Sequence, residues 1–309
     1  MISFWNLGGL SPRELVKRVL QDVKKDDVFG QAAKLSYYFL LALFPLLIFL
    51  TALLGYAAHT GSDLYNRLLG YARALLPGSA YELVVNTLDE IHAKAGGGKL
   101  SFGILATLWA ASSGIKAMMD GLNTAYGVEE GRAWWKAQIL AVALTVAFNV
   151  FVIIALAIVL YGSELGSLLA GLLGMQGVFD RFWNVLQWPV GIGFVLLAFT
   201  LFYRYAPDLK NLEWSHTIPG AVVAVALWLA ISLGFSLYLH FFNSYGATYG
   251  SLGAVIILML WLYLTGAAVL LGGEVNSEIE NAAAQAGEPE SRLAGERAPG
   301  ERRKKLRRE

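Results

Sequence analysis

Long apolar runs dominate the hydropathy pattern of this chain. Residues 35–61, 100–115, 137–163 and 182–203 contain no Asp, Glu, Lys or Arg, and residues 214–273 contain none over 60 positions. Lipid offers no partners for unpaired backbone groups, so a helix of roughly 20 apolar residues is the unit that crosses a hydrocarbon core of about 30 Å. The pattern therefore predicts an all-α, polytopic membrane protein and argues against a soluble enzyme.

The last apolar run is too long for a single crossing. Its centre, residues 241–250 (FFNSYGATYG), has the Asn, Ser and Gly residues of a turn, which divides the run into two helices. We therefore expect six transmembrane helices, at about 35–57, 100–119, 138–161, 182–203, 217–239 and 251–272. Residues 1–30 are expected to form a cytoplasmic or interfacial segment, 31–280 the transmembrane domain, and 281–309 a disordered basic tail.

Basic residues are distributed unevenly between the two sides of these spans. Of the 24 Lys and Arg residues, 19 precede the first span, follow the sixth, or lie in the second-to-third and fourth-to-fifth connections. Because positive charge is retained on the cytoplasmic side, both termini are expected in the cytoplasm. The cluster at 302–308 is expected to rest on anionic lipid, with an RNA-binding arm as the alternative.

Composition narrows the classes of function. The formal net charge is only +1, which does not suggest a nucleic-acid-binding protein, and the absence of cysteine excludes disulfides and thiolate metal sites. The four histidines are isolated from one another, and the chain has neither a Walker A loop nor a G-x-S-x-G nucleophile motif. We therefore expect no catalytic residues, no metal and no cofactor.

Two connections have patterns of their own. Apolar residues at helical spacing on both sides of Pro77-Gly78 predict a helical hairpin in the external segment 58–98, either packed on the bundle or gating a cavity. Glycines punctuate residues 162–177, which indicates a softened end of the third span, with a short re-entrant helix as the alternative. Gly162 and Gly166 also offer a close-contact face for a homo-oligomer.

Polar groups at the edges of the predicted spans are the candidates for function, because their burial in a membrane is costly. Lys34, Lys116, Arg132 and Glu274 are all expected near the cytoplasmic side, where they could converge. Snorkelling to the interface explains the two lysines equally well. Pro45 and Pro189 are expected to kink or break the first and fourth spans.

Three stretches resemble the YihY/BrkB family of bacterial inner-membrane proteins, formerly labelled ribonuclease BN-like. They are residues 32–38 (AAKLSYY) with 44–46 (FPL); 108–114 (LWAASSG) with 121–128 (GLNTAYGV) and Arg132; and 249–253 (YGSLG) with 260–263 (LWLY) and 272–276 (GGEVN). The resemblance covers about residues 15–280 and implies a six-helix inner-membrane fold with cytoplasmic ends. It also implies a link to virulence and to lipid movement across the envelope.

The motif residues and the polar edge residues together form the predicted substrate-binding set. The set is Lys34, Ser36, Tyr37, Tyr38, Trp109, Ser112, Ser113, Lys116, Asn123, Tyr126, Arg132, Tyr249, Ser251, Trp261, Glu274 and Asn276. We expect a transporter or flippase-like protein for an amphipathic, anionic envelope lipid, with membrane lipids and no nucleic acid as partners. The alternatives are a non-transporting scaffold in envelope assembly and, less favoured for want of a metal site, a membrane-associated ribonuclease.

Overall fold

The computed structural model describes residues 7–57, 98–172, 176–210, 212–241 and 245–298, with a few single positions between 58 and 97. All regular secondary structure in these ranges is helical, which confirms the all-α prediction. The helices are α1 (Pro12–Lys25), α2 (Val28–Ala57), α5 (Gly98–Ala125), α6 (Trp134–Leu172), α7 (Gln176–Tyr205), α8 (Trp214–Phe241) and α9 (Tyr245–Gln285). The predicted hairpin at 58–98 lies almost entirely outside the described residues.

The short helix α1 begins and ends at sequence signals. The Ser11 hydroxyl accepts a hydrogen bond from the Glu14 backbone N–H at 3.3 Å, and Pro12 follows as the first helical residue. The helix ends before Asp27, which has a φ of 47° and whose carboxylate accepts the Gly30 N–H at 3.3 Å. This turn lets the chain leave α1 and enter the much longer α2 directly.

Each of the six predicted spans falls within one long helix, from α2 to α9. Among the described residues, four segments are long and apolar enough to cross a membrane: Trp134–Ala155, Leu186–Tyr205, Trp214–Tyr238 and Val255–Gln285. These segments support a multi-pass membrane protein. The count of six spans and the cytoplasmic placement of both ends stay predictions.

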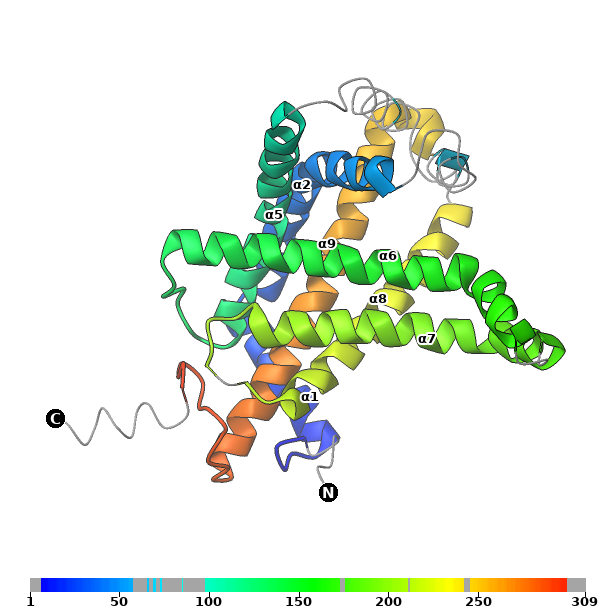
Figure 1. Cartoon of the computed structure of the whole chain (residues 1–309). Coiled ribbons are helices and arrows are strands. Elements are labelled where there is room, and N and C mark those ends of the chain that lie inside the picture. The colour runs from blue at the N-terminus through cyan, green and yellow to red at the C-terminus, as the bar shows by residue number, and fades with distance from the viewer. Residues whose placement is uncertain are drawn as a thin grey trace.

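The long helices do not form one parallel bundle. In Figure 1, α6 and α7 run side by side across the direction of α8 and α9. The main packing pairs are α8 with α9, α6 with α7, and α2 with both α5 and α9. The core where they meet includes the fully buried Leu35, Met119, Leu122, Tyr203 and Leu270.

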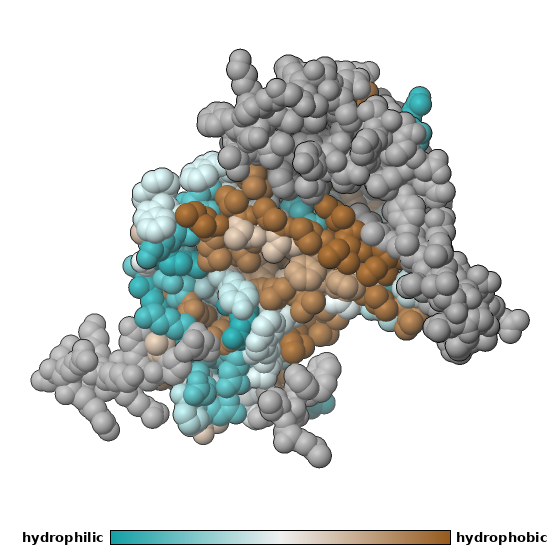
Figure 2. All heavy atoms as spheres, in the orientation of Figure 1, coloured by the Kyte–Doolittle hydropathy of each residue, from teal (hydrophilic) through white to brown (hydrophobic). Residues whose placement is uncertain are grey.

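Large apolar side chains cover much of the described outer surface. Figure 2 shows a hydrophobic band running along the helices, with hydrophilic side chains gathered to one side of it. On α6 the exposed residues Val146, Val150 and Ile154 recur at helical spacing, and on α8 so do Leu233 and Leu237. Contiguous apolar surface of this kind indicates contact with lipid or protein.

Three sequence predictions about element boundaries have a clear outcome. Helix α6 continues through Gly162 and Gly166 to Leu172, so the glycine-rich connection extends the third predicted span. Neither proline interrupts its helix: α2 runs through Pro45 and α7 through Pro189, so the predicted breaks are wrong and a bend stays a prediction. The helical backbone tolerates a missing donor where neighbouring helices support it.

The prediction of a disordered tail from residue 281 is also wrong as far as residue 298. Helix α9 extends to Gln285, and residues 286–298 turn back against the helix ends, with Ser291, Arg292 and Glu296 buried. The low content of large apolar residues misled the prediction, because polar contacts hold this segment in place. Residues 299–309 lie outside the described part of the chain.

Candidate functional site

Basic and acidic side chains from α2 and α5 meet at one end of these helices. Lys34 is exposed on α2, and Lys116 is half-buried on α5, one turn before Asp120. Enclosure by the protein raises the pKa of Asp120, whereas the charges of Lys34 and Lys116 lower it, and the net shift is upward. Asp120 was missing from the predicted set because it carries no motif signal.

Each of the two helices also carries exposed apolar or aromatic side chains on the same helix face as its lysine. Lys34, Tyr37 and Leu41 are three and four residues apart and therefore share one face of α2, as Trp109 and Lys116 share one face of α5. Tyr37 is 55% exposed, Leu41 51% and Trp109 49%. We call Lys34, Tyr37, Leu41, Trp109 and Lys116 the α2/α5 strip; on each helix a basic group shares a face with exposed apolar or aromatic side chains. The Trp109 ring also meets that of Trp134 of α6 edge to face, with ring centroids 6.5 Å apart.

Arg132 and Asn123 belong to a second polar cluster, which joins the end of α5 to the loop before α8. Arg132 Nη2 lies 2.6 Å from Glu130 Oε2 and donates to the Ala206 carbonyl at 2.9 Å. Asn123 donates to Glu130 at 3.2 Å and accepts the Asp208 backbone N–H at 2.7 Å. The polar groups of Arg132 and Asn123 are therefore bonded within the protein, where they hold two loops together.

The electrostatics of this second cluster are dominated by Glu130. Partial burial tends to raise the pKa of Glu130, but the hydrogen bonds from Arg132 outweigh it and hold the pKa below its ordinary value. Asp208 also accepts the Gly131 backbone N–H at 3.0 Å. The cluster is a network of charge-assisted bonds rather than an open binding surface.

Two predicted serines bond to their own helices. The Ser36 hydroxyl donates to the Ala33 carbonyl at 2.7 Å, and the Ser112 hydroxyl donates to the Trp109 carbonyl at 2.6 Å. Ser112 also accepts a hydrogen bond from Gln138 of α6 at 2.7 Å in a buried position. Ser112 therefore joins α5 to α6, and Gln138 is a partner that sequence reasoning missed.

Glu274 and Asn276 lie on α9. Asn276 accepts the Gly220 backbone N–H at 2.7 Å and donates to the Thr217 carbonyl at 3.1 Å, so it joins α9 to α8. The charged groups that act most strongly on buried Glu274 are Asp26 and Asp22. Glu274 therefore lies within the electrostatic influence of the end of α1, and its convergence with Lys34, Lys116 and Arg132 stays a prediction.

The aromatic members of the predicted set serve several roles. Tyr126 is buried in a small cluster, and its hydroxyl has no hydrogen-bond partner within the described residues. Trp261 donates to Ser232 at 3.4 Å, and the Tyr37 ring meets that of Tyr38 edge to face. Ser113 is half-buried. The side chains of Tyr249 and Ser251 lie outside the described part of the structure.

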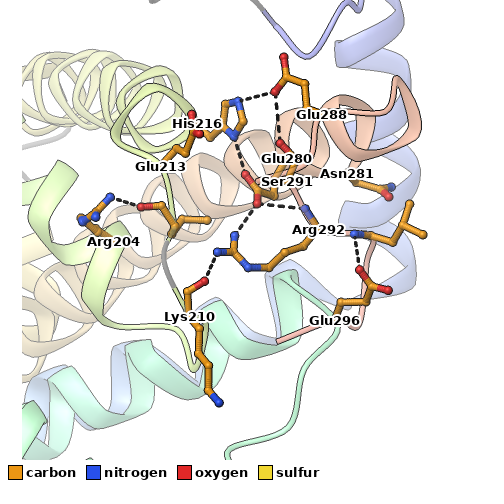
Figure 3. A network of polar contacts seen from close by, with 12 residues as sticks. Arg204, Lys210, Glu213, His216, Glu280, Asn281, Glu288, Ser291, Arg292 and Glu296 are labelled. Carbon is orange, nitrogen blue, oxygen red and sulfur yellow. Dashed lines mark hydrogen bonds and ion pairs between the residues drawn. The ribbon is translucent and has the colours of Figure 1, made fainter. Parts of the chain in front are cut away.

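A buried ionic network that the sequence did not reveal joins α8, α9 and the segment that follows α9. His216 Nδ1 of α8 lies 2.5 Å from Glu280 Oε2 of α9, and the other Glu280 oxygen binds the Arg292 guanidinium. Arg292 also donates to the Lys210 carbonyl, and its side chain is 2% exposed (Figure 3). Sequence reasoning assigned Arg292 to the tail, and no local pattern links it to Glu280.

The described residues do not include a group of three or more His, Asp or Glu side chains placed to hold a metal ion. The described helices are apolar and cross one another, and hydrogen bonds and ion pairs join their ends. The α2/α5 strip adds exposed basic and apolar side chains. Together with the four membrane-length segments, this arrangement defines a multi-pass helical membrane protein.

Comparison with known proteins identifies the family. The family model described as "Virulence factor BrkB" matches residues 19–296, so the chain belongs to the BrkB family. The match confirms the resemblance predicted from the motifs and extends past the predicted limit at residue 280, into the segment that contains Arg292.

Curated relatives carry names of two kinds. The chain is 38% identical over 248 residues to a "Putative ribonuclease-like protein YfkH" of Bacillus subtilis, covering 80% of this chain and 88% of that protein. It is 29% identical over 266 residues to the "UPF0761 membrane protein PBPRA3489" of Photobacterium profundum, covering 83% and 78%. A UPF0761 membrane protein of Stenotrophomonas maltophilia is 28% identical over 267 residues, covering 82% and 58%. No solved structure matches.

Proposed function

We propose that this protein moves an amphipathic, anionic envelope lipid across or within the bacterial inner membrane, as a transporter or flippase-like protein and not as an enzyme. The proposal includes six membrane spans and cytoplasmic ends, supported by the 19 basic residues that the predicted topology places on that side. The α2/α5 strip is the observation that carries it.

The chemistry of the strip matches the two parts of a lipid. Lys34 and Lys116 present ammonium groups that attract a phosphate, and an ammonium is a mobile point charge suited to brief contacts. Leu41 and the rings of Tyr37 and Trp109 each share a helix face with one of the two lysines and are half exposed. An acyl chain lying on them would replace water at an apolar surface, which is favourable at about 25 cal/mol per Å².

The surroundings of the strip suit transient binding. The Asp120 carboxylate lies near both lysines and competes with a bound headgroup for their charge. Gly114 of α5 lies close to α2, because a Cβ added there would stand 3.1 Å from the Phe39 ring. The two helices are thus in direct contact, so the lysines and the exposed apolar side chains belong to one packed pair of helices.

Lipid movement in reconstituted vesicles tests the proposal. Purified protein in phosphatidylcholine vesicles should move a fluorescent phosphatidylglycerol between leaflets, measured by loss of fluorescence to a quencher added outside. Lys34→Gln combined with Lys116→Gln should slow the movement by roughly tenfold, the equivalent of about 1.4 kcal/mol of lost attraction. Lys210→Gln, an exposed lysine outside the strip, is the matched control and should behave as the natural protein does.

Three results would contradict lipid movement. Vesicles with protein that scramble lipid no faster than protein-free vesicles would exclude it under these conditions. An unchanged rate in the double lysine variant would remove the strip from the mechanism. A metal-dependent cleavage of RNA by the purified protein would instead favour the ribonuclease-like name that one relative carries.

A further inference from the structure

A groove of about 900 Å³ lies on the outward side of α1, away from the helices that α1 packs against. The inner side of α1, with Leu15 and Val19, is buried, and the buried Val23 lies where this side borders the groove. The groove is lined by residues of α1 together with the first turn of α2: Arg13, Val16, Lys17, Leu20, Gln21, Val23, Lys24, Asp27 and Phe29. The helix is thus apolar on one side and both basic and apolar on the other.

The apolar residues of the groove are unusually exposed to solvent. Val16 and Leu20 are each 58% exposed and Phe29 is 51% exposed, although a surface helix normally turns such residues inward. The third side of α1 is already occupied, since Arg18 bonds to Glu14 at 3.0 Å and lies 3.8 Å from Glu278 of α9. The exposed apolar residues are therefore a separate feature from the contacts that hold α1 in place.

The charge of the groove is positive. Arg13, Lys17 and Lys24 are exposed, and none of the three has a carboxylate within 4.0 Å among the described residues. The one acidic member, Asp27, accepts the Gly30 N–H at the start of α2. Basic groups beside apolar side chains on one helix face are typical of helices that lie in the headgroup region of anionic membranes.

We propose that this groove of α1 docks on the anionic lipid surface of the membrane that the protein spans, with Leu20 and Phe29 inserted among the headgroups. Helix α2 begins at Val28, seven residues before the first predicted span, so only about 10 Å of helix separates the groove from the hydrocarbon. This docking does not require that the protein moves lipid.

Charge complementarity favours lipid over the other occupants. The terminal segment of this chain, residues 302–308, carries six basic residues and would be repelled by the groove. A second copy of the groove facing the first would add three more basic residues, so that six like charges would face one another. Phosphate headgroups supply the opposite charge, and the acyl chains supply the apolar contact.

A single fluorescent label tests the docking. The chain contains no cysteine, so Leu20→Cys in the full-length protein can carry one environment-sensitive dye. In nanodiscs containing phosphatidylglycerol, the dye emission should shift to the blue and should be quenched by lipid that is spin-labelled near the headgroup. In nanodiscs of phosphatidylcholine alone both effects should be weaker by several fold.

Matched variants separate lipid docking from other causes. Lys17→Gln with Lys24→Gln should remove the dependence on anionic lipid, and a dye on Glu14→Cys, on the ion-paired side of α1, should show no such dependence. The same water-like emission from Leu20→Cys in both membranes would overturn the proposal. So would a shift that follows protein density instead of lipid charge, which indicates a second copy.

Discussion

Individual polar residues in this protein divide into those bonded by the protein itself and those left available. Asn123, Ser112 and Asn276 make hydrogen bonds of 2.7 to 3.2 Å that tie helices and loops together. Lys34 is exposed and Lys116 is half-buried, both beside Asp120. A buried polar group must find a partner or incur a cost of about 1–3 kcal/mol, so the bonds made by these three residues stabilise the fold.

The Glu130 carboxylate gives a pH prediction. Its pKa in the folded protein lies below the ordinary value of 4.5, so its bonds to Arg132 stabilise the fold fully above that pH and are lost as pH falls through the folded pKa. Glu130→Gln should lower the free energy of unfolding near neutral pH by about 1–2 kcal/mol, with a smaller difference in acid. Thermal unfolding in detergent between about pH 7 and pH 3 measures this.

The neighbouring residue provides the control for that experiment. Glu129 is exposed, and among the described residues its one bonded group is the backbone carbonyl, which accepts from Arg297 at 2.7 Å. Glu129→Gln should therefore leave the pH profile of unfolding as it is in the natural protein. If Glu130→Gln and the natural protein lose stability in parallel as the pH falls, the carboxylate does not provide the stabilisation assigned to it.

At the scale of elements, glycine decides how closely α8 and α9 approach. A Cβ placed on Gly220 would lie 2.0 Å from the Gly272 carbonyl oxygen, and one on Gly272 would lie 2.3 Å from the Tyr203 hydroxyl oxygen. The same closeness lets Asn276 of α9 reach the Gly220 backbone N–H. Small residues at such crossings are a usual device of membrane helices.

Adding one methyl group at this crossing should separate the two helices. Gly220→Ala should cost about 1–3 kcal/mol, because the obstructing atoms include a backbone oxygen that cannot rotate away. Gly234→Ala on the same helix is the matched control, since nothing lies within 4 Å of a Cβ there. Thermal unfolding in detergent should show a lower midpoint for the first variant and an unchanged or higher one for the second; equal midpoints would disprove the close contact.

At the scale of the whole molecule, the segment after α9 fastens loops that are distant in sequence. Arg292 binds Glu280 and the Lys210 carbonyl, Gly295 donates its N–H to the Tyr126 carbonyl at 3.0 Å, and Lys210 donates its N–H to the Arg297 carbonyl at 2.9 Å. Removing Arg292 would leave the buried Glu280 carboxylate with His216 as its remaining charged partner. Breaking a buried ion pair from one side costs about 3–5 kcal/mol.

Truncation separates this segment from the residues beyond it. A chain ending after residue 285 should be markedly less stable and more sensitive to protease at residues 206–213, whereas a chain ending after residue 298 should keep the stability of the full-length protein. Arg292→Met in the full-length chain should reproduce part of the loss. Limited proteolysis and thermal unfolding compare all three, and equal stability of the two truncated chains would show that residues 286–298 do not fasten the loops.

The sequence by itself determined the class of protein, the approximate position of each long helix and the family. These properties depend on local composition and short motifs, and an apolar run of about 20 residues has few other fates than a membrane helix. The lysines at the ends of α2 and α5 could likewise be found from their places beside apolar runs.

Only the tertiary structure decided which polar residues meet. His216 and Glu280 are 64 residues apart, and Arg132 and Ala206 are 74 apart, so no spacing rule connects them. It also decided that Glu274 lies within the electrostatic influence of Asp26 and Asp22, and that residues 286–298 fold back onto the helix ends. Such contacts depend on how the helices cross, and the crossings depend on the fit of side chains and glycines from distant parts of the chain.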